Sequence, residues 1–162
     1  MGKILKVKEA IKIAKKIREQ NKSVVLAGGC FDILHIGHIK FLENAKKYGD
    51  VLFVLLESDT NVKKQKGDNR PINTQTNRAI ILSSLTAVDY TVILPELKTD
   101  NEYDAIITKI HPSIIATTDN DPHRVHKERQ AKQINEKVAY VIKRIYDQST
   151  SKLASLLKGE SL

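Results

Sequence analysis

The stretch that decides the fold is residues 24–50, VVLAGGCFDILHIGHIKFLENAKKYGD. Its first four residues, 24–27, are all apolar, as expected of a β-strand that is buried on both faces. Gly28 and Gly29 end this run and leave room for a close approach of other backbone or of a ligand. Apolar side chains then recur at helical spacing, at Ile39, Leu42 and Ala45. Because Gly49-Asp50 ends that pattern, the stretch predicts a strand, a glycine-rich turn and a helix.

Two histidines lie where this helix begins. His35 and His38 are three residues apart, with Gly37 between them. A helix N-terminus offers free backbone N–H groups and positive potential, and imidazoles can donate hydrogen bonds to oxygens. This arrangement suits a phosphate chain, although two histidines at this spacing could also be a metal pair or surface residues.

The rest of the chain alternates between strand and helix patterns. Further strands are predicted by apolar runs at residues 51–56, 88–94, 113–116 and 138–142. Helices are predicted over residues 6–20, 74–85 and 103–110, with two more opening at Asp121-Pro122 and at Ser149. Such alternation predicts an α/β, Rossmann-like three-layer sandwich with a five-stranded, mostly parallel sheet. Ligands bind such sheets beyond the carboxyl ends of the strands.

Length and charge limit the possible functions. The 162 residues predict a single domain, 1–162, in which residues 1–22 form an N-terminal helical extension. The net charge of +8 favours anionic partners such as nucleotides or nucleic acids. An aromatic content of 5% without tryptophan offers little for base stacking on a single strand. No apolar run is long enough for a membrane span, and neither a signal peptide nor a second cysteine is present, so we expect a cytoplasmic protein.

A long polar segment, residues 57–73, follows the second predicted strand. It contains four cations, Lys63, Lys64, Lys66 and Arg70. A loop of this length in a compact domain is usually functional or disordered. We interpret it as a cationic flap that closes over phosphates, the alternative being a mobile, solvated loop. Arg78 then falls in the first turn of a helix, where a cation opposes the helix dipole, so it is either solvated or bound to a phosphate.

His123 and His126 repeat the three-residue spacing in a helix that also carries several lysines and arginines. No cysteine or well-spaced carboxylate accompanies them as a third ligand for zinc. We therefore interpret this helix as presenting a solvated basic face.

The residues GCFDILHIGH, 29–38, resemble the HxGH signature of the cytidylyltransferase-like nucleotidyltransferase family. The resemblance continues through HIKFLENAKKYGD, ESDTNVKKQKGDNRPIN and NRAIILSSLTAVDYTVI, and returns at RIYDQSTSKL near the C-terminus. It covers most of the chain in the right order and spacing. Members of this family join a nucleotide to a phosphorylated small molecule and release pyrophosphate, and this is the activity that the resemblance implies.

The resemblance also assigns roles to individual residues. The implied catalytic residues are His35, His38, Lys66 and Arg144. The implied nucleotide-binding residues are Gly29, Cys30, Phe31, His35, Gly37, His38, Lys64, Arg78, Asp119, Arg144, Ser149, Thr150 and Ser151. The implied substrate-binding residues are Asp32, Lys64, Lys66 and Arg70. A nucleophilic role for Cys30 is not expected, because no histidine is evidently paired with it as a base.

The partners implied are ATP or CTP, a phosphorylated small molecule and Mg²⁺ carried by the nucleotide, with no protein metal site. The resemblance also implies a homodimer that binds neither nucleic acid nor membrane.

Several members of the family are similar to this chain. The N-terminal helix, GGCFDILH and KGDNRPIN resemble heptose-1-phosphate adenylyltransferase, the ADP-heptose synthase of lipopolysaccharide core assembly. HIKFLENAKKYGD and the KKQK segment resemble glycerol-3-phosphate cytidylyltransferase. We favour ATP and a heptose-1-phosphate-like acceptor. The alternatives are CTP with glycerol 3-phosphate, an FAD synthetase-like adenylyltransferase, and a non-enzymatic nucleotide- or nucleic-acid-binding protein. Residues 116–119, ATTD, depart from the KGGD of the heptose enzymes.

Overall fold

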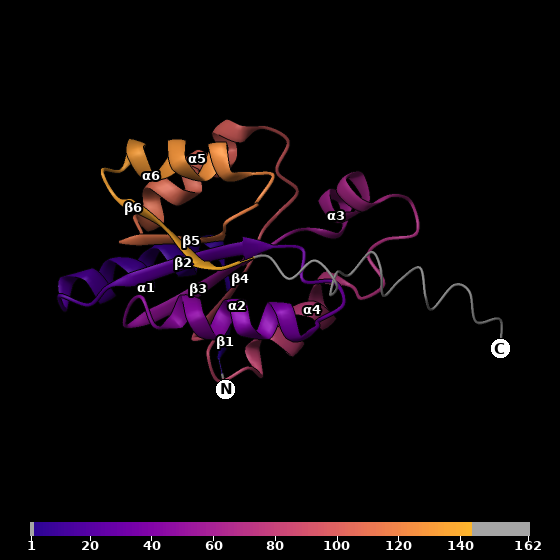
Figure 1. Ribbon diagram of the computed structural model, residues 1–162, viewed down its shortest axis with the longest axis horizontal. Helices are drawn as coiled ribbons and strands as arrows, with labels where there is room; N and C mark the ends of the chain where they lie inside the picture. The colour runs from indigo at the N-terminus through magenta and orange to yellow at the C-terminus, as the bar shows by residue number, and fades with distance from the viewer. Residues whose placement is uncertain (1, 144–162) are drawn as a thin grey trace.

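A computed structural model describes residues 2–143 of the chain. Its centre is one parallel sheet in the order β1-β4-β3-β2-β5-β6 (Figure 1). The strands are β1 Lys3–Lys6, β2 Val24–Gly29, β3 Val51–Leu56, β4 Tyr90–Ile93, β5 Ile114–Thr118 and β6 Lys137–Ile142. The helices are α1 Val7–Glu19, α2 Ile36–Lys46, α3 Asp59–Lys66, α4 Gln75–Ser83, α5 Asp100–Ile110 and α6 Arg124–Gln133. The predicted α/β, Rossmann-like class with a parallel sheet is confirmed.

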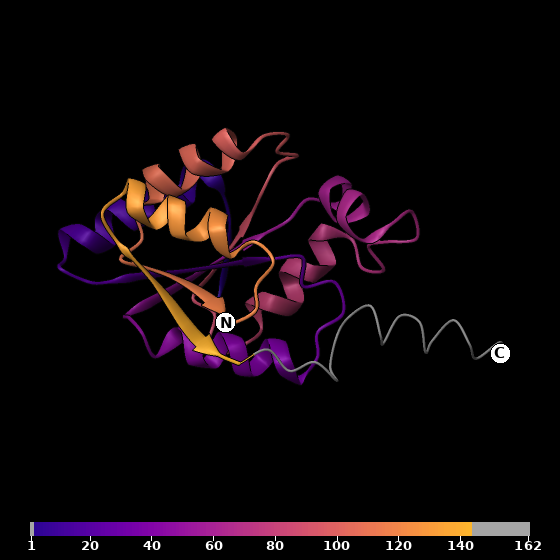
Figure 2. The ribbon, with the colours of Figure 1, turned by 45° about the horizontal axis from the view of Figure 1, so that its top comes forward.

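Helices cover both faces of the sheet, as Figures 1 and 2 show. One apolar core joins the sheet to α1, α5 and α6, and a second joins it to α2 and α4. The residues of β2 alternate between these cores: Val24 and Leu26 lie in the first, and Val25 and Ala27 in the second. All four are buried, which explains why the strand reads as a continuous apolar run.

The predicted number of strands is wrong, because the sheet has six strands and not five. The missed strand is β1, which pairs in parallel with β4 at the edge of the sheet. It spans only four residues, KILK, and Leu5 is its only buried side chain. Such a short edge strand has no apolar run from which it could be recognised.

The segment 57–73 is not one long loop, because it contains the helix α3. Ser58 caps this helix by accepting a hydrogen bond from the Asn61 N–H at 3.2 Å, and Gly67 ends it with a φ of 99°. Val62 is the single apolar residue among its eight, so periodicity gave no helical signal. In Figures 1 and 2, α3 lies beyond the carboxyl ends of the strands.

Within residues 2–143, no helix is both long and apolar enough to span a membrane.

Candidate active site

His35 begins the helix α2 as its N-cap residue. Its Nδ1 accepts a hydrogen bond from the Gly37 N–H at 3.1 Å. Since Nδ1 is the acceptor, the proton of the neutral ring lies on Nε2, which is free to donate. Burial lowers the pKa of His35 below its usual value, which favours this neutral form.

His38 stacks against His35 one turn into the helix. The two imidazole ring centroids are 3.8 Å apart, and the Phe31 ring lies edge to face with that of His38 at a centroid distance of 5.2 Å. Burial, with smaller contributions from the nearby His35 and the Lys66 charge, lowers the pKa of His38 to about 3 against the opposing effect of a backbone hydrogen bond with Ile33. Its Nδ1 is buried and has no hydrogen-bond partner among residues 2–143. The structure thus brings the two predicted catalytic histidines together as neutral rings at one helix N-terminus.

Small residues make room for this arrangement. A side chain at Gly29 would place its Cβ 3.0 Å from the Phe31 ring, so glycine lets that ring pack against the end of β2. Cys30 is half-buried, and its Sγ donates to Gln65 Oε1 at 3.5 Å. Burial raises the pKa of the Cys30 thiol, which disfavours the thiolate that a nucleophile would need.

Asp32 and Arg70 face each other inside the protein. Asp32 is 1% exposed, and its Oδ2 lies 2.5 Å from both Nε and Nη2 of Arg70. Its carboxylate also accepts the backbone N–H groups of Ile72 and Asn73 at 2.9–3.0 Å. Burial opposes ionisation, but these hydrogen bonds and the Arg70 charge still hold the pKa of Asp32 below its usual value. The pair joins residues 70–73 to residues 30–38, which carry both histidines and are called the histidine turn below. Its predicted contact with substrate stays a prediction.

Arg78 is fully buried. Its guanidinium donates to the backbone carbonyls of Asn73, Cys30 and Glu57 and forms an ion pair with Asp59 at 2.6 Å. These contacts join α4 to the end of β2 and to the start of α3. In this structure Arg78 therefore braces the turns around the site, and its predicted contact with the nucleotide stays a prediction.

The lysines of α3 differ in their partners. Lys64 pairs with Glu96 at 2.8 Å, and Lys63 pairs with Asp68 at 3.4 Å. Lys66 makes no ion pair with a described residue, and its positive charge lowers the pKa values of both His38 and Cys30. Of the two lysines assigned by the resemblance, Lys66 is the one that has no ion-pair partner among residues 2–143 and lies near enough to His38 to affect its pKa.

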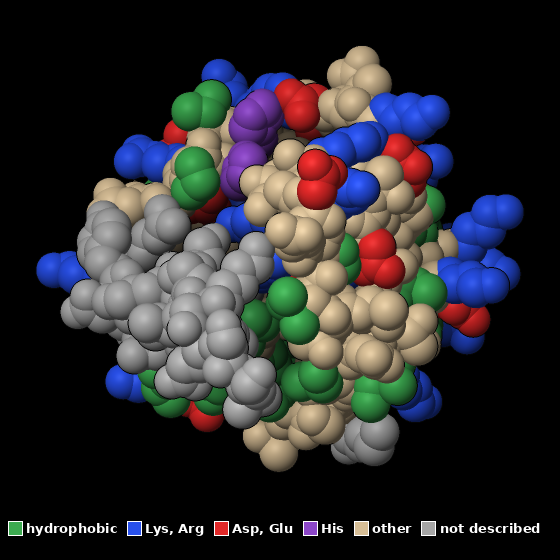
Figure 3. All heavy atoms as spheres, turned by 90° about the vertical axis from the view of Figure 1, so that its right-hand side faces the viewer, with side chains coloured by type: hydrophobic (Ala, Val, Ile, Leu, Met, Phe, Trp, Pro, Cys, Tyr) green, Lys and Arg blue, Asp and Glu red, His purple; other side chains and the backbone are tan. Residues whose placement is uncertain are grey.

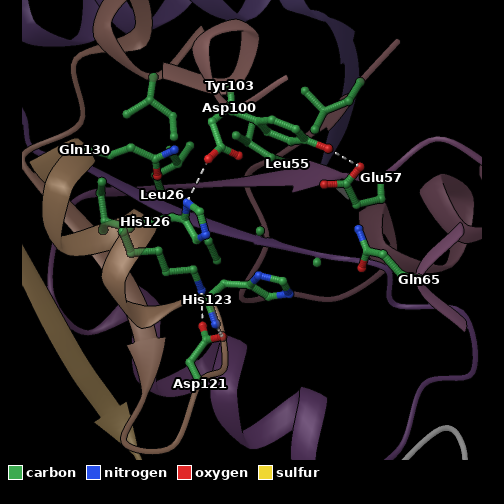
Figure 4. Close-up of a pocket in the computed structure, with 17 residues that line it drawn as sticks. Leu26, Leu55, Glu57, Gln65, Asp100, Tyr103, Asp121, His123, His126 and Gln130 are labelled. Atoms are coloured by element: carbon green, nitrogen blue, oxygen red, sulfur yellow. Dashed lines mark hydrogen bonds and ion pairs between the residues drawn. The ribbon is translucent and has the colours of Figure 1, made fainter. Parts of the chain in front are cut away.

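A pocket of about 310 Å³ lies on the other side of β2, between the sheet, α5 and α6. Leu26, Leu55, Ile107 and Ile115 make its apolar floor. Polar side chains from several elements surround this floor (Figure 4): Glu57, Gln65, Asp100, Tyr103, Asp121, His123, His126, Lys127 and Gln130. Figure 3 shows the face toward which the strands point, where histidine, acidic and basic side chains gather. The interpretation of this helix as a solvated face is confirmed for His123 and Arg124, which are exposed, but His123 and His126 also line this pocket.

Asp121, rather than the predicted Asp119, lines the pocket after β5. Its Oδ2 accepts from Thr117 Oγ1 at 2.6 Å and from Lys127 Nζ at 2.5 Å. Burial favours the protonated form, but the Lys127 ammonium and the hydrogen bonds hold the pKa of Asp121 at about 2. Asp121 and Lys127 thus form an ion pair in the pocket wall. The predicted role of Asp119 in nucleotide binding stays a prediction.

Sequence reasoning missed the polar wall that Glu57 and Tyr103 make. Tyr103 Oη donates to Glu57 Oε2 at 3.0 Å, across 46 positions of sequence. One signal was available, because Glu57 is the first residue after a buried strand, at the edge where ligands bind parallel sheets.

Four predicted site residues, Arg144, Ser149, Thr150 and Ser151, lie outside the described residues. Among the described residues, no group of three or more histidine, cysteine, aspartate or glutamate side chains could hold a metal ion.

The structure is thus an α/β domain with a parallel sheet, a histidine turn at the carboxyl edge of that sheet and an adjacent pocket. A family model described as cytidylyltransferase-like matches residues 26–155, and the chain belongs to this family.

The most similar relatives found include two bacterial proteins described as bifunctional protein HldE. The chain is 49% identical to the protein of Aliarcobacter butzleri over 107 aligned residues. This aligned region covers 66% of this chain and 22% of the relative. It is 50% identical over 103 residues to that of Nitratiruptor sp., covering 64% of this chain and 21% of the relative. The chain therefore spans about a fifth of the length of these relatives.

Solved structures share the fold. A lipopolysaccharide core biosynthesis protein from Thermoplasma volcanium matches with a TM-score of 0.61 and 26% identity, over 78% of this chain and 99% of that one. A pantoate-beta-alanine ligase from Francisella tularensis matches with a TM-score of 0.63 over 98% of this chain and 77% of that one. Its identity of 16% shows a common fold alone.

Proposed function

We propose that this protein is an adenylyltransferase that transfers AMP from ATP to a sugar phosphate resembling heptose 1-phosphate. The observation that carries the proposal is the stacked pair His35 and His38 at the N-terminus of α2. The similarity to the HldE proteins and to a lipopolysaccharide core biosynthesis protein supports ATP and a sugar of this kind.

In the proposed reaction, an oxygen of the acceptor phosphate attacks the α-phosphorus of ATP. A new oxygen–phosphorus bond forms, the bond from that phosphorus to the α,β-bridging oxygen breaks, and pyrophosphate leaves with the bonding electron pair. Such transfers depend on alignment and on neutralising the charge that builds up on phosphate oxygens. No covalent enzyme intermediate is required.

The histidine turn supplies this neutralisation through donors. His35 Nε2 carries the proton that it can donate, because Nδ1 is occupied by the Gly37 N–H. The Gly37 N–H donates to His35 Nδ1 and the His38 N–H to the His35 carbonyl, so α2 itself contributes the positive end of its dipole, which favours anions. Lys66 adds a full positive charge close to His38. Preorganised donors of this kind stabilise a transition state without the cost of reorienting water.

Magnesium is expected to bind through the oxygens of the triphosphate, whose charge it would partly neutralise. The described residues offer no carboxylate cluster that would hold it instead. We further propose a cytoplasmic homodimer, which rests on the single cysteine and on the family resemblance. Light scattering of the purified protein tests the oligomeric state, and a monomer at micromolar concentration would contradict it.

Pyrophosphate release tests the proposed activity. The protein is incubated with Mg²⁺ and either ATP or CTP, together with heptose 1-phosphate, glycerol 3-phosphate or FMN. We expect release with ATP and heptose 1-phosphate, and turnover at least tenfold lower with CTP, since a pocket that hydrogen-bonds one base leaves groups unpaired with another. A preference for CTP and glycerol 3-phosphate would establish the cytidylyltransferase alternative, and release only with FMN the FAD synthetase-like one.

A further inference from the structure

The pocket between the sheet, α5 and α6 is acidic although the protein as a whole is basic. Three carboxylates line it, from Glu57, Asp100 and Asp121, against the single ammonium of Lys127. Arg129 also pairs with Asp100 at 3.7 Å, so with neutral imidazoles the three carboxylates and the two cations beside them leave a formal charge of −1 within a chain of +8. Such a wall repels phosphate groups. The charged part of a ligand therefore belongs on the other side of β2, beside the histidine turn and Lys66, and an uncharged part belongs in the pocket.

The size and lining of the pocket suit a single sugar-like group. Its volume of about 310 Å³ is at the small end for ligand pockets, which span roughly 300–1,000 Å³. Figure 4 shows polar side chains that converge on the cavity from opposite sides of an aliphatic floor, among them Glu57, Gln65 and Gln130. Nucleobases are bound largely by stacking on aromatic side chains, whereas the hydroxyls of a sugar can form hydrogen bonds in several directions above an apolar surface. The polar side chains on opposite sides of this pocket therefore favour a sugar over a nucleobase as its occupant.

Glu57 is the best-oriented acceptor in this wall. Its Oε2 accepts from Tyr103 Oη at 3.0 Å and from Asn61 Nδ2 at 3.3 Å. Asn61 is buried, and its Nδ2 also donates to the Leu97 carbonyl at 3.0 Å. These contacts fix the position of the Glu57 carboxylate. Figure 4 shows the other oxygen of Glu57 turned toward the cavity. Burial raises the pKa of Glu57, as expected of a carboxylate that lacks enough donors.

We propose that this pocket receives the hydroxyl-bearing carbon skeleton of the acceptor, and that Glu57 determines its specificity by accepting a hydrogen bond from a sugar hydroxyl. Tyr103 and Asn61 are positioning residues, which hold the Glu57 carboxylate in place. The inference rests on the proposed function and deepens it, because it assigns the sugar to the acidic pocket and the phosphates to the histidine turn.

Titration calorimetry tests the assignment by measuring the two ligands separately. Heptose 1-phosphate is titrated into protein saturated with Mg²⁺ and α,β-methylene-ATP, an analogue that cannot transfer AMP, and the analogue is titrated alone. The proteins are the wild type, Glu57→Gln and Tyr103→Phe. The matched control is Glu128→Gln, the same change in an exposed carboxylate of α6 that pairs with Arg124 and Tyr140 outside the pocket. Pyrophosphate release is measured in parallel on the same preparations.

For Glu57→Gln we expect the Kd of heptose 1-phosphate to rise about fivefold, since a hydrogen bond to a charged group is worth roughly 1 kcal/mol more than one to a neutral group. The Kd of the analogue should stay within twofold, Glu128→Gln should match the wild type, and Tyr103→Phe should show a smaller rise.

Weaker binding of the analogue with unchanged binding of the sugar phosphate would place the nucleoside in the pocket and overturn the inference. Failure of the wild type to bind heptose 1-phosphate would overturn it as well. A third outcome separates the two proposals: Glu57→Gln loses binding of heptose 1-phosphate, but the wild type releases no pyrophosphate. This result would support the pocket as the sugar site and would reject the proposed transfer reaction.

Discussion

Replacing Asp32 by Asn should destabilise the protein more than any exposed change of the same kind. The Asp32 side chain is 0% exposed, and the Arg70 side chain that faces it is 7% exposed. The amide could still accept from the N–H groups of Ile72 and Asn73, but the Arg70 guanidinium would be left buried without a counter-charge. Breaking a buried ion pair by removing one partner costs about 3–5 kcal/mol of unfolding free energy.

Urea denaturation followed by circular dichroism measures this loss. With a slope of about 2 kcal/mol per M, the midpoint should fall by roughly 1.5–2.5 M. The double variant Asp32→Asn/Arg70→Met, which removes both charges, should be more stable than Asp32→Asn alone. Asp68→Asn is the matched control, because the Asp68 side chain is 93% exposed and pairs with Lys63 at the surface. If Asp32→Asn lost no more stability than this control, the reasoning about the buried pair would be refuted.

Three further predictions concern the histidine turn and α3. His38→Ala should lower kcat by about 100- to 1,000-fold, as loss of one preorganised donor typically does, while circular dichroism shows an intact fold; wild-type turnover would contradict the assigned site. The pKa of His38 is about 3 in the folded protein and 6.5, the ordinary histidine value, in the unfolded chain. Between these two pH values His38 is protonated only when the chain is unfolded, so the free energy of unfolding should decline as the pH drops from about 6.5 toward 3. Urea titrations at several pH values between about 7 and 5 give the free energy of unfolding as a function of pH. This free energy should change with pH less steeply in His38→Gln than in the wild type, by about 1 kcal/mol per pH unit, and equal pH dependences would count against a buried neutral His38. Finally, backbone amides of Asp59–Lys66 should exchange hydrogen more slowly when ATP and Mg²⁺ bind, and unchanged exchange in a saturated sample would reject closure of α3 over the phosphates.

The central unit of the fold could be predicted because its signals are local. Residues 24–27 are buried on both faces and therefore form a continuous apolar run, and the helix that follows places Leu42 and Ala45 in the core at helical spacing. Thr74 was recognisable as the N-cap of α4 from its residue type, and its Oγ1 accepts from the Asn77 N–H. Elements without an apolar pattern, β1 and α3, were not recognisable in this way.

The partners of the charged residues could not be predicted from the sequence. Asp32 and Arg70 are 38 positions apart, and nothing local indicates that they neutralise each other in the interior. Arg78 reads as an exposed cation in a first helical turn, and only the folded chain shows that backbone carbonyls from three segments surround it. The sequence therefore indicated the turn that carries His35 and His38, while tertiary packing decides which charged residues neutralise one another in the interior.

The most direct test of the proposed adenylyl transfer is the fate of each phosphate of ATP. The protein is incubated with Mg²⁺, heptose 1-phosphate and ATP labelled with ³²P at either the α- or the γ-position, and the products are separated by chromatography. The α-label should move into a nucleoside diphosphate sugar, and the γ-label should appear in an equal amount of pyrophosphate. A γ-label found on the sugar, or released as orthophosphate, would show phosphoryl transfer or hydrolysis and would contradict adenylyl transfer.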